Sequence, residues 1–276
     1  MKKHLAPRKI IVAVAPVGRS VAPPAINPLT PRQVADEVIR CARAGASMVH
    51  LHVRDAKGVQ TEEIDAYAAT LDRIRAASDI VIQGSTGGLT TLSLEQRCVA
   101  LNDPRTEVAS LNMGSVNFGE EVYINRLPDI RYWAKRMRRT HTVPEMEIFD
   151  SGMLPAARAL IAEGVIKAPY SICFCLGFRW TLAPDPRSLF FMASFLDEAV
   201  PWGVIQDGMT DFTLLAAAIG LGASLVRVGF EDSIFWAPGQ AVRRNVELVQ
   251  RLAQLVRLLG HEVATPDEAR RILGIG

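Results

Sequence analysis

Short apolar runs alternate with longer amphipathic stretches along the whole chain. The apolar runs predict eight strands, at residues 10–15, 48–53, 80–83, 108–112, 144–149, 170–175, 203–205 and 225–229. Helical spacing of apolar residues predicts helices at about 31–44, 62–77, 94–100, 125–139, 150–163, 186–199, 209–220 and 240–259. A last helix opens at Thr265 and Pro266, with threonine as the N-cap and proline in the first turn.

Eight consecutive strand and helix pairs favour an α/β fold of the (β/α)₈ TIM barrel type over a doubly wound sheet. A dinucleotide-binding fold would place a GxGxxG motif directly after the first strand, but residues 16–19 read Pro-Val-Gly-Arg. No linker or change of composition marks a boundary. We therefore expect one barrel domain over residues 1–276, with a C-terminal helical extension.

Charge and cysteine content narrow the class of protein. The 31 lysines and arginines nearly balance the 29 acidic residues, and the one basic cluster, at 131–139, has the pattern of a solvated helix face, so we expect no nucleic-acid partner. The cysteines lack a CxxC spacing or a disulfide-rich density, which predicts reduced thiols and a cytoplasmic protein: Cys41, Cys98, Cys173 and Cys175. Residues 1–8 have no apolar signal core, and no apolar run predicts a membrane span.

Two histidines, His50 and His52, interrupt the second predicted strand. Alternate residues of a strand share a face, so these imidazoles are about 6 to 7 Å apart on one side of a rigid backbone. This spacing suits two ligands of one metal ion. The alternative is a pair of histidines satisfied within the core, and the strand alone does not decide between the two.

The active site of a TIM barrel lies at the carboxyl ends of its strands. Residues at or just beyond these predicted ends form a polar ring: Arg19, His50, His52, Ser85, Thr86, Ser110, Asn112, Glu147, Arg179, Asp207, Arg227, Glu231 and Asp232. Glu231 follows the last strand, which lies close to the second strand across the barrel mouth. It can therefore complete a set of two histidines and one glutamate that is common for catalytic zinc. The alternatives are that Glu147 pairs with an arginine inside the barrel and that Glu231 and Asp232 only begin a loop.

Four motifs together resemble the β-keto acid cleavage enzymes. They are His-Leu-His-Val-Arg-Asp at 50–55, Ser-Thr-Gly-Gly at 85–88, the segment 110–119, and Arg-Val-Gly-Phe-Glu-Asp at 227–232. The resemblance extends over nearly the whole chain, as far as Ala-Thr-Pro-Asp-Glu-Ala at 264–269. It implies a TIM barrel with a catalytic zinc ion that condenses a 3-oxo acid with acetyl-CoA to give acetoacetate and a new acyl-CoA.

The resemblance also implies roles for single residues. His50, His52 and Glu231 match the zinc ligands, Asp232 the general base, and Arg227 the arginine that orients this base. Polar positions of the substrate pocket correspond to Ser85, Thr86, Gly87, Ser110, Asn112 and Glu147. Such a set makes chemical sense, because a Lewis acid on the 3-oxo oxygen eases removal of a C2 proton by a carboxylate.

Residues that would meet the far end of the substrate depart from the family pattern. Ser20 stands where an acidic residue would bind a substrate amino group, and the loop 177–182 is bulkier and carries Arg179. The segment 206–210 also differs, which affects the expected contacts to substrate and CoA. A guanidinium from Arg19 or Arg179 would favour a dicarboxylic 3-oxo acid over a cationic one. Alternatively, both arginines face solvent or another subunit, and a pocket for an uncharged tail is lined by Phe178, Trp180 and Leu182.

Two functions of other classes stay open on the sequence. The first is another metal-dependent barrel enzyme, such as an aldolase, a lyase or a hydrolase. The second is a catalytically silent barrel that binds a small acid or serves as an assembly subunit. Whichever function holds, the apolar stretch 230–238 with Phe235 and Trp236 predicts a homo-oligomer.

Overall fold

A closed ring of parallel strands forms the centre of the computed structural model, which describes residues 6–17, 26–87, 92–197 and 200–276. Within this part of the chain the ring consists of β1 (Lys9–Val14), β2 (Met48–Leu51), β3 (Val81–Gly84), β4 (Val108–Asn112), β7 (Val143–Ile148), β8 (Ser171–Leu176), β9 (Trp202–Gln206) and β10 (Leu225–Val228). Pairing of β10 with β1, from Leu225 opposite Ile11 to Val228 opposite Val14, closes the ring. The predicted TIM barrel is confirmed.

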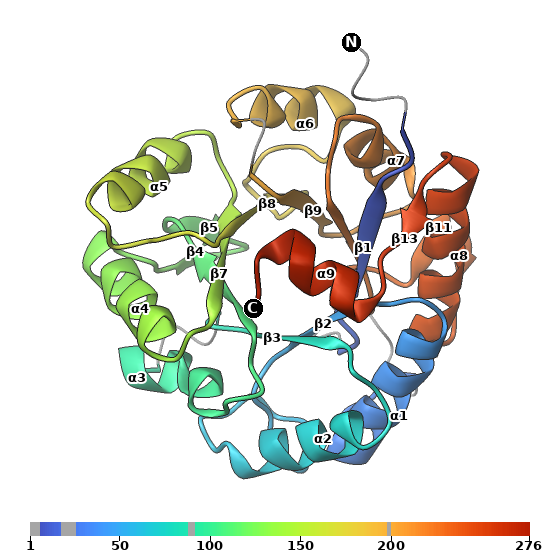
Figure 1. The fold of residues 1–276 in the computed structure, drawn as a ribbon, viewed down its shortest axis with the longest axis horizontal. Coiled ribbons are helices and arrows are strands. Elements are labelled where there is room, and N and C mark those ends of the chain that lie inside the picture. The colour runs from blue at the N-terminus through green and yellow to red at the C-terminus, as the bar shows by residue number, and fades with distance from the viewer. Residues whose placement is uncertain (1–5, 18–25, 88–91, 198–199) are drawn as a thin grey trace.

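Helices surround this ring in the order of the chain (Figure 1). They are α1 (Pro31–Arg43), α2 (Asp65–Arg75), α3 (Leu94–Arg97) with the 3₁₀ turn Val99–Asn102, α4 (Leu127–Arg139), α5 (Met153–Ala162), α6 (Pro186–Ala193), α7 (Thr213–Gly220) and α8 (Asn245–Leu258). α1 illustrates why they form: Thr30 and Gln33 make a capping box, Pro31 occupies the first turn, and Val34 and Val38 lie on the buried stripe.

The amino-terminal end of the barrel is closed by the last two elements, β13 (Glu262–Val263) and α9 (Pro266–Leu273). β13 pairs with Lys9 and Ile10 of β1, and α9 lies across the ring in Figure 1. Ala269 and Leu273 of α9 belong to one buried cluster with the residues at the lower interior of the strands: Ile11, Ala13, Met48, Val81, Val108, Val143 and Leu225. The last helix therefore fills the bottom of the barrel.

Two hairpins were not predicted: β5 (Val116–Phe118) with β6 (Glu121–Tyr123), and β11 (Phe235–Ala237) with β12 (Gln240–Ala241). Because Gln240 and Ala241 pair with β11, the helix predicted from residue 240 begins only at Asn245. The predicted helices 62–77 and 209–220 are likewise shorter, and β2 ends at Leu51, which leaves His52 just beyond the strand.

The apolar stretch 230–238 is only partly covered, because residues 234–237 are half-buried. Phe230 is fully buried, and the guanidinium of Arg251 lies 3.7 Å from the ring centroid of Trp236. Large exposed apolar side chains occur instead on and after α6, at Phe190, Phe191 and Phe195. All four cysteines are free thiols and buried. Among the described helices, none combines the length and the apolar character needed to cross a membrane.

Candidate metal centre and active site

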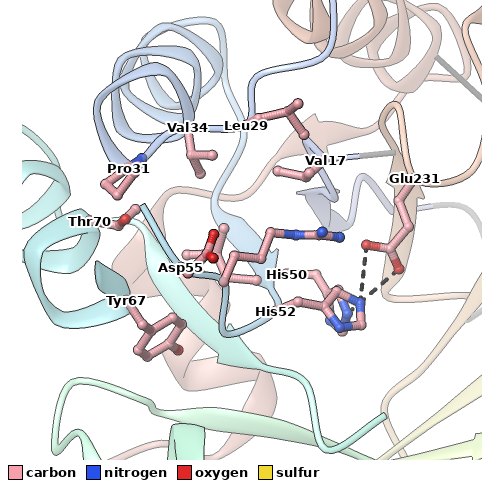
Figure 2. A pocket seen from close by; sticks show the side chains of 12 residues that line it. Val17, Leu29, Pro31, Val34, His50, His52, Asp55, Tyr67, Thr70 and Glu231 are labelled. Carbon is pink, nitrogen blue, oxygen red and sulfur yellow. Dashed lines mark ion pairs between the residues drawn. The ribbon is translucent and has the colours of Figure 1, made fainter. Parts of the chain in front are cut away.

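Three potential metal ligands converge at the barrel mouth: His50 on β2, His52 just after it, and Glu231 after β10 (Figure 2). The Nε2 atom of His50 lies 3.7 Å from Glu231 Oε1, and that of His52 lies 3.5 Å from Oε2. Three atoms bound at about 2.1 Å to one tetrahedral ion would be roughly 3.4 Å apart. One ligand atom from each of the three residues lies within 4.8 Å of the other two, so the donors are close enough together to hold one metal ion.

Close backbone packing positions Glu231. Gly229 has a φ of 147°, and a Cβ added there would lie 2.1 Å from the carbonyl oxygen of Ala15 on the loop after β1. Only glycine allows this approach. The amide of Glu231 then donates to the same carbonyl oxygen at 3.2 Å, which holds the glutamate over the mouth beside β1 and β2.

A cavity extends from these ligands along the outer side of β2 (Figure 2). Its walls come from the start of α1, with Leu29, Pro31 and Val34, and from α2, with Tyr67 and Thr70. The ligand set thus borders both the barrel mouth and a largely apolar recess.

The two imidazoles have different surroundings. His50 is 3% exposed, and burial lowers its pKa to about 3, so that it is neutral as a metal ligand must be. Its Nδ1 lies 2.8 Å from Gln83 Oε1. His52 is more accessible, and its Nδ1 lies 3.4 Å from Nε2 of Gln60, which also donates to the carbonyl oxygen of Gly87.

Arg227 connects the candidate ligand Glu231 with the candidate base Asp232. Its Nε donates to Asp232 Oδ2 at 2.9 Å, its Nη2 donates to Oδ1, and Nη2 also lies 3.3 Å from Glu231 Oε1. Burial raises the pKa of Asp232 to about 6 although the guanidinium opposes this. For Glu231, burial acts in the same direction, but His50 and Arg227 hold its pKa well below the usual value.

Glu147 and Asn112 form a second polar pair on the interior of β7 and β4. Asn112 Nδ2 donates to Glu147 Oε2 at 2.6 Å. Burial raises the pKa of Glu147 to about 8, so this carboxyl is protonated at neutral pH. Within the described part of the chain no donor reaches the buried Oδ1 of Asn112, which leaves an acceptor for a ligand or water.

The loop after β3 is held by its own hydroxyl groups. Thr86 Oγ1 donates to the carbonyl oxygen of Ser110 at 2.5 Å, and the Thr86 amide donates to Ser110 Oγ, so both residues are buried in the wall. Ser85 Oγ accepts from the amide of Gly87, and these two residues line a small cavity. A Cβ on Gly87 would lie 2.7 Å from the Tyr123 hydroxyl.

Of the two arginines expected to select the substrate tail, the structure describes only Arg179. Arg19 and Ser20 lie outside the described residues. Arg179 has a side chain 61% exposed and forms an ion pair of 3.0 Å with Glu120 between β5 and β6. Trp180 donates to the carbonyl oxygen of Gly119, which ties the loop 177–182 to this hairpin. Binding of a substrate carboxylate by Arg179 therefore stays a prediction.

Several residues around the site were not predicted from the sequence. Gln83 and Gln60 contact the two histidines, Glu145 contacts Gln83, and Tyr123 comes from an unpredicted hairpin. Gln83 and Glu145 carried one usable signal: each is a polar residue at an alternate position of a strand whose neighbours are apolar. Asp207, after β9, is part of the predicted ring, and burial raises its pKa.

Comparisons with known proteins agree with each other. A family model described as beta-keto acid cleavage enzyme matches residues 9–275. The chain is 35% identical to a 3-keto-5-aminohexanoate cleavage enzyme of Fusobacterium nucleatum, over 97% of this chain and 98% of the relative. It is 33% identical to a 3-oxoadipate:acetyl-CoA acetyltransferase of Cupriavidus necator, over 90% and 89%. The solved apo structure of ObcA has a TM-score of 0.76 at 21% identity, over 91% of this chain but 66% of ObcA, and supports the fold alone.

Proposed function

The chain belongs to the beta-keto acid cleavage enzyme family, and on this premise we propose that it condenses a 3-oxo acid with acetyl-CoA, releasing acetoacetate and a new acyl-CoA. The observation that carries the proposal is the convergence of His50, His52 and Glu231 beside the Arg227 and Asp232 pair. The names of two relatives support it, since one describes cleavage of a 3-keto acid and the other acyl transfer with acetyl-CoA.

We propose that His50, His52 and Glu231 hold a zinc ion. Two imidazoles and one carboxylate are a donor set typical of catalytic zinc, and the side chain of Glu231 remains 24% exposed. A bound zinc ion would supply Lewis-acid stabilisation of the negative charge that develops on the 3-oxo oxygen.

Asp232 is the proposed general base that takes the proton from C2 of the 3-oxo acid. Arg227 fixes both carboxylate oxygens, so the base is oriented before the substrate arrives. A pKa near 6 makes Asp232 a stronger base than an ordinary aspartate while it remains mostly ionised at neutral pH.

The remaining steps follow from the carbon nucleophile that this deprotonation creates. C2 attacks the thioester carbonyl of acetyl-CoA and expels the CoA thiolate, which then adds to the former 3-oxo carbon. The bond between C2 and C3 breaks to give the new acyl-CoA, and C2 takes a proton back from Asp232 to give acetoacetate. Protonated Glu147 is proposed to donate to an oxygen atom of the substrate, together with Ser85 and Gly87. The open acceptor of Asn112 is proposed to bind a hydrogen-bond donor, such as a water molecule beside the substrate. Thr86 and Ser110 are proposed to shape the pocket by holding this loop.

We further propose that the protein acts in the cytoplasm as a homo-oligomer. Four free, buried thiols suit a reducing compartment. The exposed phenylalanines Phe190, Phe191 and Phe195 form apolar surface of the kind that subunit contacts cover.

Incubation of purified protein with acetyl-CoA and a panel of 3-oxo acids, with acetoacetate as the readout, tests the proposed reaction. We expect acetoacetate to form, and we expect one zinc ion per chain by elemental analysis. His50→Ala should lose both metal and activity, whereas His261→Ala, at the opposite end of the barrel beside β13, should keep both. Zinc without CoA-dependent turnover would favour another metal-dependent barrel enzyme, and a protein with neither would favour a silent acid-binding barrel.

A further inference from the structure

Three buried polar side chains form a hydrogen-bonded chain across the barrel interior, from β2 through β3 to β7. His50 Nδ1 lies 2.8 Å from Gln83 Oε1, and Gln83 Nε2 donates to Glu145 Oε1 at 2.8 Å. His50 and Gln83 are direct partners in the sheet register. All three are almost inaccessible, with exposed fractions of 3%, 1% and 3%.

This polar layer is not what stability of the barrel requires. Two residues earlier on the same strands, the interior positions are apolar and pack with α9: Met48, Val81 and Val143. Burying an amide and a carboxyl group costs free energy even when they are hydrogen-bonded, and apolar side chains of similar volume are often at least as stabilising. The polar layer therefore calls for an explanation in terms of function.

The hydrogen-bond chain has a defined direction. The acceptor oxygen of Glu145 orients the amide NH₂ of Gln83 toward β7, so the amide oxygen of Gln83 faces His50. An amide oxygen only accepts hydrogen bonds, so Nδ1 of His50 must carry the proton. The lone pair of His50 is then on Nε2, the atom that faces Glu231.

We propose that Gln83 and Glu145 are positioning residues that hold His50 as the Nδ1–H tautomer, with its Nε2 lone pair directed at the metal. The proposal rests on the proposed function for the identity of that metal. Partners of this kind fix the orientation of a histidine ligand and raise its basicity. His52 differs, because its Nδ1 faces the amide nitrogen of Gln60 at 3.4 Å. Hence we infer that His50 is the pre-oriented ligand.

The tautomer can be measured directly on the full-length, zinc-free wild-type chain. Long-range ¹H–¹⁵N spectra of the histidine rings, with His50 assigned by its loss in His50→Ala, distinguish the two protonated nitrogens. We expect a neutral ring with the proton on Nδ1. A proton on Nε2 overturns the proposal.

Zinc affinity, measured by competition with a chromophoric chelator, tests the two positioning residues. Gln83→Met has the same length without the amide, and should weaken zinc binding about 10- to 100-fold and mix the His50 tautomers. Glu145→Met leaves the Gln83 amide free to turn and should weaken binding about tenfold, whereas Glu145→Gln retains an acceptor oxygen and should bind within roughly threefold of wild type.

Cys173→Ala is the matched control, because Cys173 is likewise fully buried in a strand of the barrel, on β8 opposite Glu147. This substitution should leave the zinc affinity unchanged. Wild-type affinity in Gln83→Met, or equal losses in Glu145→Gln and Glu145→Met, would overturn the proposal. If circular dichroism shows that Gln83→Met does not fold, the proposal is tested by the zinc affinities of Glu145→Gln and Glu145→Met and by the His50 tautomer of the wild-type chain. These readouts need no turnover, so failure of the proposed reaction, seen as missing acetoacetate, remains a separate result.

Discussion

Replacement of Glu147 by glutamine should change how the stability of the protein depends on pH. Burial raises the pKa of this carboxyl from an ordinary 4.5 to about 8. Below 4.5 the native and the unfolded chain both hold the proton, and between 4.5 and about 8 only the native chain does. The stabilisation from Glu147 is therefore fully present below 4.5 and is lost as the pH rises through about 8.

The magnitude follows from the size of this pKa change. At about 1.4 kcal/mol per pH unit, the fall across the window is at most roughly 5 kcal/mol, and we expect roughly 2 to 5 kcal/mol once local relaxation is allowed for. The large value is reasonable for a side chain only 8% exposed. Glutamine keeps the shape and an acceptor for Asn112 but cannot ionise, so Glu147→Gln should lack this fall.

Urea unfolding of the zinc-free, full-length protein at pH 5, 6, 7, 8 and 9 measures the effect. The difference in unfolding free energy between Glu147→Gln and wild type should grow with pH up to about 8 and then level off. Glu63→Gln, at an exposed carboxylate before α2, is the control and should follow wild type. Parallel curves for Glu147→Gln and wild type would show that the native carboxyl is ionised at neutral pH and would refute this reasoning.

Three further outcomes are expected. Asp232→Asn should retain zinc but lose turnover by about 100-fold or more, and a near-normal rate would show that another group takes the C2 proton. Leu273→Ala in α9 should lower the unfolding free energy by about 2 to 5 kcal/mol in urea titrations and leave zinc affinity unchanged. No loss of stability would mean that the packing of α9 against the bottom of the barrel is dispensable. Arg179→Ala should reduce kcat/KM for a dicarboxylic 3-oxo acid about tenfold more than for a neutral one, whereas equal losses would limit Arg179 to holding the hairpin through Glu120.

The barrel was predictable because its strands are buried on both faces and so appear as apolar runs. Helix ends were less certain, since the amphipathic pattern before Asp65 continues into a loop. The hairpin of β5 and β6 gave no burial pattern, because Phe118 and Val122 are exposed at the barrel mouth.

Within the site, strand periodicity was enough to place His50 and His52 on one face. The position of Glu231 followed from barrel closure and from the family resemblance. The contact between Gln83 and Glu145 could not be predicted, because it reaches across β4 and depends on the register of three strands. A periodic pattern gives the face of a residue but not its partner on another strand.

The closure of the barrel by β10, β13 and α9 also has a consequence for biosynthesis. β1 leaves the ribosome long before its partners, because Leu225 and Glu262 are made more than 200 residues later. Until then, one edge of the nascent sheet and the apolar interior around Ile11 remain uncovered, a state prone to aggregation. Folding of the barrel should therefore finish only after synthesis of α9, and the growing polypeptide should depend on chaperones that shield an open sheet.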